Sequence, residues 1–152
     1  MLIEGSFTIA APQARVWEKI TDAGLMAGCI PGCEAIEVVD PKTYKARVKV
    51  AVGPISARFD LVVEVTEEVP PERVVSVTRG DEGTRASVVS AENRLELKAT
   101  EDGATEVVYA SEVSVTGRLG KFGLGVMKKK AQSLSEEFVR NFRAKVEMET
   151  AS

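Results

Sequence analysis

The sequence predicts an α+β domain in which a curved antiparallel sheet of seven strands wraps around a long C-terminal helix. Apolar and polar residues alternate through most of residues 34–115, as in strands that bury one face. The one long helical periodicity lies in residues 116–148, and its apolar stripe is wide enough to cover a sheet. Two short helical stretches follow the first strand. Since 152 residues are most simply one domain, we expect a single unit over residues 1–152.

The N-terminal part begins with a half-buried strand over residues 2–10. Its inward positions in the alternation are Ile3, Gly5, Phe7 and Ile9. Residues 12–21 are predicted to form a helix, because a proline at the start suits the first turn. Residues 22–28 are predicted to form a second short helix, capped by the aspartate at its start. The sequence Ile30-Pro31-Gly32-Cys33 then ends helical structure.

Six further strands follow, separated by turn sequences. The breaks are Asp40-Pro41-Lys42, Gly53-Pro54, Pro70-Pro71-Glu72, residues 80–83 and Glu101-Asp102-Gly103. The predicted strands contain residues 36–38, 44–52, 55–65, 75–77, 91–99 and 105–115. A sheet of this many twisted strands curls, and its dry face must be covered by the helices.

The long helix carries the apolar stripe that such a sheet needs. The stripe contains Gly123, Met127, Ala131, Leu134, Phe138 and Phe142. A long helix on a curved sheet rarely fills the space, so we expect an apolar cavity between them, with the short helices as its lid. The expected lining residues are Phe59, Leu61, Leu95, Leu97 and Val113 on strands, Phe122, Val126, Met127 and Lys130 on the helix, and Leu25, Met26 and Ile30 in the lid.

Four glycines between residues 117 and 125 precede or begin this helix. Because small residues leave room, we expect the cavity beside them and solid packing around Leu134, Phe138 and Phe142. Each interior glycine also destabilises a helix. We therefore predict that this segment and the lid are loosely held and form the two sides of one mouth.

Composition and charge argue against several classes of function. A net charge of −3 argues against a nucleic-acid partner. The chain has no histidine, no nucleophile motif and no acid pair at a diagnostic spacing, so we assign no catalytic residue, metal ligand or cofactor. Cys29 and Cys33 are too few for structural zinc and do not form C-x-x-C, so we expect reduced thiols in a cytoplasmic protein. No signal peptide or membrane-spanning run is present in the sequence.

Several features allow more than one interpretation. Residues 30–34, Ile-Pro-Gly-Cys-Glu, are either a functional lip of the cavity or a tight turn in which Cys33 packs as a small buried side chain. Residues 128–130 are three lysines that either bind a membrane or partner or are solvated charge, and the helical wheel spreads them apart. Lys130, nearest the apolar stripe, either snorkels outward or meets a polar ligand head. Asn93 and Ser111 share the inward phase, where each is a ligand contact, a water site or a rim residue.

Several short motifs lie along this order of elements. They are Gly5-Ser6-Phe7, Ala11-Pro12, Val16-Trp17, Ile30-Pro31-Gly32-Cys33-Glu34, Val52-Gly53-Pro54, Pro70-Pro71-Glu72-Arg73, Asn93-x-Leu95-x-Leu97 and Gly117-x-Leu119. Together they resemble the helix-grip fold of the START-like (SRPBCC) superfamily and, within it, the family of the carbon monoxide dehydrogenase G subunit. The resemblance covers nearly the whole chain, and Ile-Pro-Gly-Cys-Glu is its most specific part. Similar proteins often continue past the helix into a linker and a membrane-binding tail, whereas this sequence ends at Ser152.

The resemblance implies a small non-enzymatic accessory protein of molybdenum-containing carbon monoxide dehydrogenase systems. Such a protein would hold a lipid-like or quinone-like molecule in the cavity. It would link the molybdenum hydroxylase to the membrane, with peripheral contact at the inner face of the cell membrane. The superfamily also implies an alternative, a small polyketide cyclase or dehydratase that uses the same cavity. A third alternative is an interaction module whose cavity is filled by its own side chains.

Overall fold

The computed structural model describes residues 1–83 and 86–151, and these contain seven strands, two short helices, a 3-10 turn and one long helix. The elements are β1 (Leu2–Ile9), α1 (Gln13–Ile20), α2 (Ala23–Gly28), β2 (Cys33–Asp40), β3 (Thr43–Val52), β4 (Ile55–Val69), β5 (Arg73–Glu82), β6 (Ser87–Ala99), β7 (Thr105–Gly117), η1 (Gly120–Phe122) and α3 (Leu124–Ala151). The predicted α+β class and order of elements are confirmed.

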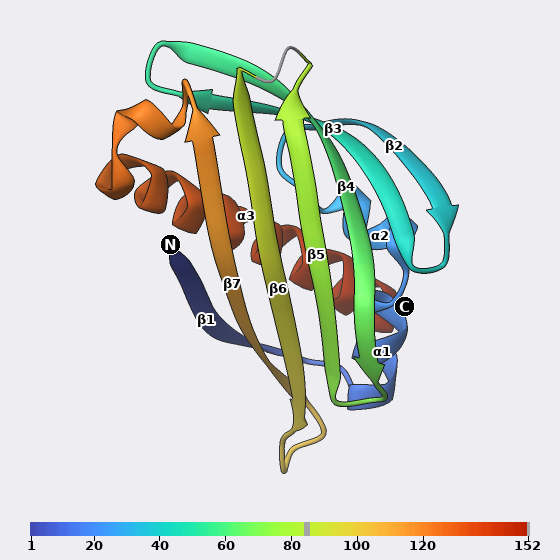
Figure 1. Ribbon diagram of the computed structural model, residues 1–152. Coiled ribbons are helices and arrows are strands. Elements are labelled where there is room, and N and C mark those ends of the chain that lie inside the picture. The colour runs from blue at the N-terminus through green and yellow to red at the C-terminus, as the bar shows by residue number, and fades with distance from the viewer. Residues whose placement is uncertain (84–85, 152) are drawn as a thin grey trace.

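The strands form one antiparallel sheet in the order β1-β7-β6-β5-β4-β3-β2. Strands β2 to β7 follow one another as neighbours, and β1 returns to pair with β7, so that Gly5 lies opposite Tyr109. The sheet is curved, and α3 crosses its concave face (Figure 1). Helix α2 packs beside β2 and β3, whereas α1 contacts α2 and β6. Alternation along each strand therefore turns every second side chain toward α3.

Apolar packing against α3 is concentrated near its two ends. Near the C-terminal end, Phe142 and Val146 join one buried cluster, together with Ile9, Val16, Ile20, Val74, Leu97 and Val107. Near the N-terminal end, Met127 joins another cluster that contains Val52, Ala57, Phe59 and Leu119. Between these ends, Leu134 and Phe138 are only half-buried. The middle of the helix is thus held over the sheet without filling the space below it.

Several boundaries differ from the sequence prediction. The long helix begins at Leu124, because residues up to Gly117 extend β7 and residues 120–122 form η1. Gly117 and Gly123 have φ values of 89° and 93°, a conformation that favours glycine, so these glycines belong to turns and not to a helix. The predicted turn at residues 80–83 is wrong for residues 80–82, because β5 continues to Glu82.

Arg118 and Leu119, in the connection between β7 and η1, bind to the end of β5 and the start of β6. The Arg118 guanidinium donates to both carboxylate oxygens of Glu82, with Nε 3.0 Å from Oε1 and 2.9 Å from Oε2. The backbone N–H of Leu119 donates to the buried hydroxyl of Ser87 at 3.1 Å. These contacts place η1 and the start of α3 beside the ends of β5, β6 and β7.

Candidate functional site

A cavity of about 300 Å³ lies between the middle of α3 and the concave face of the sheet. From α3 it is lined by Leu134, Ser135, Phe138, Val139 and Phe142. Five of the twelve strand residues that line it are apolar: Phe7, Leu61, Val63, Leu95 and Val107. Its volume lies at the lower end of the range of about 300–1,000 Å³ typical of small-molecule sites. The predicted cavity is therefore present, beneath the middle of the helix.

One side of the cavity is formed by α2 and the turn that follows it, which supply Met26, Ile30 and Pro31. The Asp22 carboxylate caps α2 by accepting from the backbone N–H of Leu25 at 3.1 Å. In the turn, Gly32 has φ 75°, and a Cβ there would collide with the backbone carbonyl of Lys49. Residues 30–33 are thus a tight turn, and the same turn brings Ile30 and Pro31 to the cavity.

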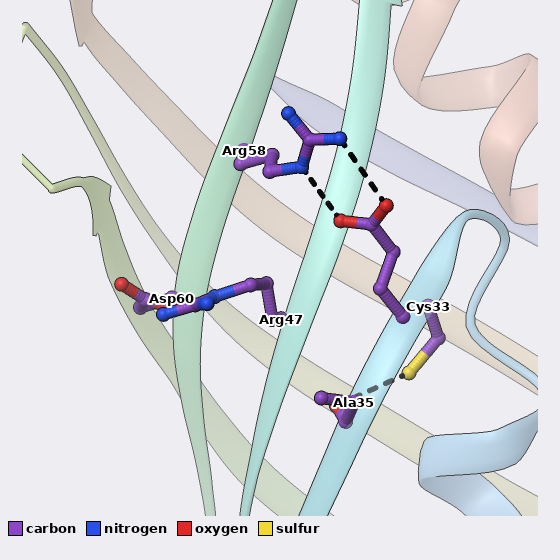
Figure 2. Close-up of polar contacts among 6 residues, drawn as sticks. Cys33, Ala35, Arg47, Arg58 and Asp60 are labelled. Atoms are coloured by element: carbon purple, nitrogen blue, oxygen red, sulfur yellow. Dashed lines mark hydrogen bonds and ion pairs between the residues drawn. The ribbon is translucent and has the colours of Figure 1, made fainter.

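The other residues of the Ile-Pro-Gly-Cys-Glu motif contact neighbouring strands outside the cavity. Glu34 accepts from Arg58 Nε at 2.8 Å, beside a second pair in which Arg47 Nε lies 3.0 Å from Asp60 (Figure 2). The Arg58 guanidinium holds the pKa of the Glu34 carboxyl below its usual range. Cys33 is half-buried, and its Sγ lies 3.6 Å from the Ala35 carbonyl oxygen, so the prediction of a buried Cys33 is wrong.

A cluster of polar side chains crosses three strands on the cavity wall; we call it the Asn93 cluster and define it as Ser76, Thr78, Asn93 and Ser111. Asn93 Nδ2 donates to Thr78 Oγ1 at 3.0 Å and to Ser76 Oγ at 3.4 Å. Ser111 Oγ donates to Asn93 Oδ1 at 2.8 Å. Strand register explains the arrangement, since Asn93 lies opposite Ser76 on one side and Ser111 on the other. All four residues line the cavity.

Tyr44 and Tyr109 also line the cavity, from β3 and β7. Burial raises the pKa of Tyr44, and the nearby thiols of Cys29 and Cys33 add to this effect. Burial also raises the pKa of Tyr109, with a smaller contribution from Glu136. Both side chains are therefore neutral phenols, and among the described residues neither hydroxyl has a hydrogen-bond partner.

A second, wider hollow of about 780 Å³ adjoins the glycine-rich segment. We call it the groove; its lining includes Met1, Ala91, Val113, Val115, Gly120, Gly123, Leu124 and Met127. Thr78 lines both hollows, so the groove approaches the cavity at the Asn93 cluster. Leu124 is 69% exposed at the groove and Val126 is 48% exposed on the same turn of α3.

The structure divides the twelve residues that the sequence predicts as lining. Met26, Ile30, Leu61 and Leu95 line the cavity, while Val113 and Met127 line the groove. Leu25, Phe59, Leu97 and Phe122 instead pack into or against the hydrophobic clusters. The remaining two predictions are corrected: Val126 is half-exposed, and Lys130 is half-buried but lines neither the cavity nor the groove.

Two further predictions about the helix need correction. Leu134 and Phe138 are half-buried and line the cavity, so the prediction of solid packing is wrong for them, whereas Phe142 is 2% exposed in a buried cluster, as predicted. The glycine-rich segment lines the groove, whereas α2 and its following turn line the cavity. These segments therefore do not form the two sides of one mouth in this structure.

Sequence reasoning missed Tyr44, Tyr109, Ser76 and Thr78 as cavity residues. The signal that could have found the tyrosines is their phase, because both occupy inward positions of their alternating strands. For Ser76 and Thr78 the signal is the strand register, which places them opposite the inward-facing Asn93 and Ala91.

Among the described residues, no group of three or more His, Cys, Asp or Glu side chains is placed to hold a metal ion. No described helix combines the length and the apolar character needed to cross a membrane.

The chain is similar to several solved structures that share its fold. A conserved protein from Geobacillus kaustophilus is 24% identical, with a TM-score of 0.86 over 96% of this chain and 95% of that chain. A START superfamily protein from Mycobacterium smegmatis is 14% identical, with a TM-score of 0.76 over 97% of each chain. The Zhui aromatase/cyclase from Streptomyces sp. R1128 is 16% identical, with a TM-score of 0.66 over 97% of this chain and 93% of that chain. These similarities confirm the START-like helix-grip fold.

At the level of sequence, no match is found among curated proteins. The model of one family, that of the carbon monoxide dehydrogenase G subunit (CoxG), matches residues 5–147. This match reaches both edge strands and includes the turn at residues 30–34 and nearly all of α3, so it spans every element that builds the cavity. The chain belongs to the CoxG family, the family of the carbon monoxide dehydrogenase G subunit.

Proposed function

We propose that this protein is a non-enzymatic accessory protein that binds a lipid-like or quinone-like molecule in the cavity. The observation that carries the proposal is the position of this cavity, beneath the middle of a helix whose ends are both well packed. Apolar side chains that border a space lack packing partners on that side, which lowers stability. Keeping a cavity of about 300 Å³ in a domain of 152 residues is therefore most simply explained by an occupant.

The cavity wall favours an uncharged, largely apolar occupant. Among the described residues that line the cavity, Arg94 is the only charged one, and it is exposed to solvent. A carboxylate or ammonium group would be desolvated there without an opposite charge. A molecule with a long apolar body could extend from the cavity past Thr78 toward the groove.

Ligand content and cavity filling test this proposal together. Organic extracts of the purified protein, analysed by mass spectrometry, should contain a lipid or quinone. Ser135→Phe should place a ring in the cavity and weaken binding of an apolar fluorescent dye by about tenfold, which corresponds to about 1.4 kcal/mol of binding free energy. Ser133→Phe, two residues away at an exposed position of α3, is the matched control and should bind normally. If the wild-type protein carries no ligand and takes up no dye, the proposal fails.

We further propose that the groove opens toward the inner face of the cell membrane, where the protein serves a molybdenum hydroxylase from the cytoplasmic side. The support is the exposure of Leu124 and Val126 around the start of α3, together with the exposed lysines 121, 128 and 129, although the helix spreads these side chains over more than one face. Apolar side chains beside lysines suit the surface of an anionic bilayer. The partner enzyme is inferred from the family, which is named for carbon monoxide dehydrogenase.

Vesicle flotation and a binding assay test these two partners separately. The protein should float with phosphatidylglycerol vesicles and not with phosphatidylcholine vesicles, and Leu124→Ser with Val126→Ser should abolish flotation. Immobilised protein should retain the purified molybdenum hydroxylase of the same organism. Equal flotation with both vesicle types would contradict the membrane proposal, and lack of retention would contradict the enzyme partner.

A second candidate function is supported by the neutral phenols of Tyr44 and Tyr109. The protein that shares this fold and is described as an aromatase/cyclase suggests that such a cavity can hold a polyketide-like substrate. An uncharged phenol in an apolar site can donate a hydrogen bond to a carbonyl oxygen and so stabilise negative charge that develops there. Incubation with a synthetic triketone distinguishes the candidates: a carrier returns it unchanged, whereas an enzyme yields a dehydrated ring that Tyr44→Phe or Tyr109→Phe diminishes.

A further inference from the structure

We propose that the Asn93 cluster binds a neutral acceptor oxygen of the cavity ligand, such as the carbonyl of a ketone, an ester or a ring carbonyl. This inference rests on the proposed function, because it requires that the cavity takes a ligand. It adds the chemistry of that ligand's polar group and the place where the group lies.

A count of donor hydrogens leads to this assignment. The cluster has five of them, two on the Asn93 amide and one on each hydroxyl of Ser76, Thr78 and Ser111. Within the described residues, three hydrogen bonds join these groups to one another. Two donor hydrogens are therefore left over, and in the observed orientation they belong to the hydroxyls of Ser76 and Thr78. The count is the same whichever way the amide is turned.

The position of the cluster directs these donors toward a ligand. Ser76, Thr78, Asn93 and Ser111 all line the cavity, and Thr78 also lines the groove. Apolar Leu95, next but one after Asn93 on the same face, lines the cavity beside them. An oxygen in the cavity beside Thr78 would thus reach two hydroxyl donors while the rest of the molecule contacts apolar side chains.

The surroundings favour an uncharged acceptor over an anion. Within the described lining of the cavity, no lysine is present, and Arg94 is exposed on the opposite phase of β6. An anion would therefore lose its hydration without gaining a cation. A carbonyl oxygen has two lone pairs, so it can accept from Ser76 and Thr78 together.

A purely structural role does not account for this cluster. Polar groups on a cavity wall gain little net stability from bonding one another, and apolar residues of the same shape can replace such a set at little cost. The strand positions around it show that apolar residues suit this face, since Leu61, Val63 and Val107 occupy it. A ligand that uses the spare donors gives the cluster an energetic role.

The test compares two ligands that differ by a single oxygen, 2-acetylnaphthalene and 2-ethylnaphthalene. Binding constants are measured for both with the wild-type protein and with Ser76→Ala/Thr78→Val, which removes two hydroxyls with little change of shape. Comparing the ratio of the two affinities between the two proteins cancels the different solubilities of the ligands. Ser6→Ala/Thr8→Val, the same pair of substitutions at two exposed positions of β1, is the control.

We expect the cavity variant to lower the ratio of ketone affinity to hydrocarbon affinity by about three- to tenfold relative to wild type, the usual effect of one hydrogen bond. The control should leave the ratio unchanged. If both compounds bind and the ratio is the same in the cavity variant, the inference is overturned while the proposed function stands. If neither compound binds the wild-type protein, the proposed function fails and this inference fails with it.

A spectroscopic measurement on the wild-type protein is independent of whether the variant folds. The infrared C=O stretch of bound 2-acetylnaphthalene should lie below its frequency in hexane, since donation from hydroxyls weakens the carbonyl bond. A hexane-like frequency for the bound ketone would overturn the inference.

Discussion

The hydroxyl group of Tyr109 lies beside Gly5, where a side chain on residue 5 would begin. A Cβ at Gly5 would be 2.5 Å from Tyr109 Oη and 2.8 Å from Cζ. The two residues are partners in the β1–β7 register, and the Tyr109 ring lies against Gly5, in the space that a side chain on residue 5 would occupy. Because Tyr109 lines the cavity, the shape of the cavity wall depends on residue 5 of β1 being a glycine.

We predict that Gly5→Ala narrows the cavity with little loss of stability. The nearest atoms to the new methyl group belong to the far end of the Tyr109 side chain, and we expect this ring to move into the cavity that it lines. Binding of an apolar dye should fall several-fold, while the melting temperature changes little. Gly125→Ala, at a position with nothing within 4 Å, should leave dye binding unaltered. A large drop in melting temperature without a change in binding would show that Tyr109 cannot move.

Truncations along α3 should give stability losses that follow the packing at its ends. Phe142 is 2% exposed in a buried cluster, so Phe142→Ala should lower the free energy of unfolding by about 3–5 kcal/mol. Leu134→Ala should cost less, roughly 2 kcal/mol or under, because one side of this leucine already faces empty space. Val126→Ala should stay within about 0.5 kcal/mol. Urea unfolding measures all three, and equal losses at Leu134 and Phe142 would mean that the middle of the helix is fully packed.

Local patterns in the sequence were sufficient for the fold. Alternation in residues 44–52 and 105–115 identified the inward faces of β3 and β7, because the period of a strand is short and independent of its partners. The apolar stripe likewise identified the face of α3 that meets the sheet. Boundaries were less predictable where glycines are involved, since Gly117 and Gly123 adopt turn conformations that apolar periodicity does not detect.

The site was predicted only in part, because an inward phase does not say whether a residue packs or borders a space. Phe59 and Leu61 share a phase on β4, yet Phe59 is buried in a cluster and Leu61 lines the cavity. What separates them is their distance from the two ends of α3, which only the tertiary structure gives. The donor count at Asn93 likewise needed the register of β5, β6 and β7.

The two cysteines should differ sharply in reactivity. Cys29 is fully buried, and burial raises the pKa of its thiol, partly offset by Lys145. Cys33 is half-buried beside the turn. Since the thiolate is the reactive form, iodoacetamide should modify Cys33 in the native protein and Cys29 only after unfolding. Peptide mass spectrometry after timed alkylation distinguishes the two, with Cys33→Ser as the control. Rapid modification of Cys29 in native protein would contradict its burial.

The pair formed by Arg118 and Glu82 should make stability depend on pH in the acid range. The Arg118 guanidinium holds the pKa of the Glu82 carboxyl below its usual range, with help from Ser87. A carboxyl group whose pKa is lower in the folded state stabilises the fold at pH values above its unfolded pKa, about 4.3. That contribution is lost as the pH falls through the lower folded value.

We therefore predict that Arg118→Gln lowers the melting temperature at pH 7, because the Glu82 carboxylate, whose side chain is 9% exposed, loses its partner. The difference from wild type should narrow as the pH falls below about 4, where protonation removes the charge that Arg118 stabilises. Arg140→Gln removes the same charge from an exposed position of α3 and should show no such dependence. A difference that stays constant from pH 7 to pH 3 would mean that Arg118 stabilises the connection through contacts other than its pair with Glu82.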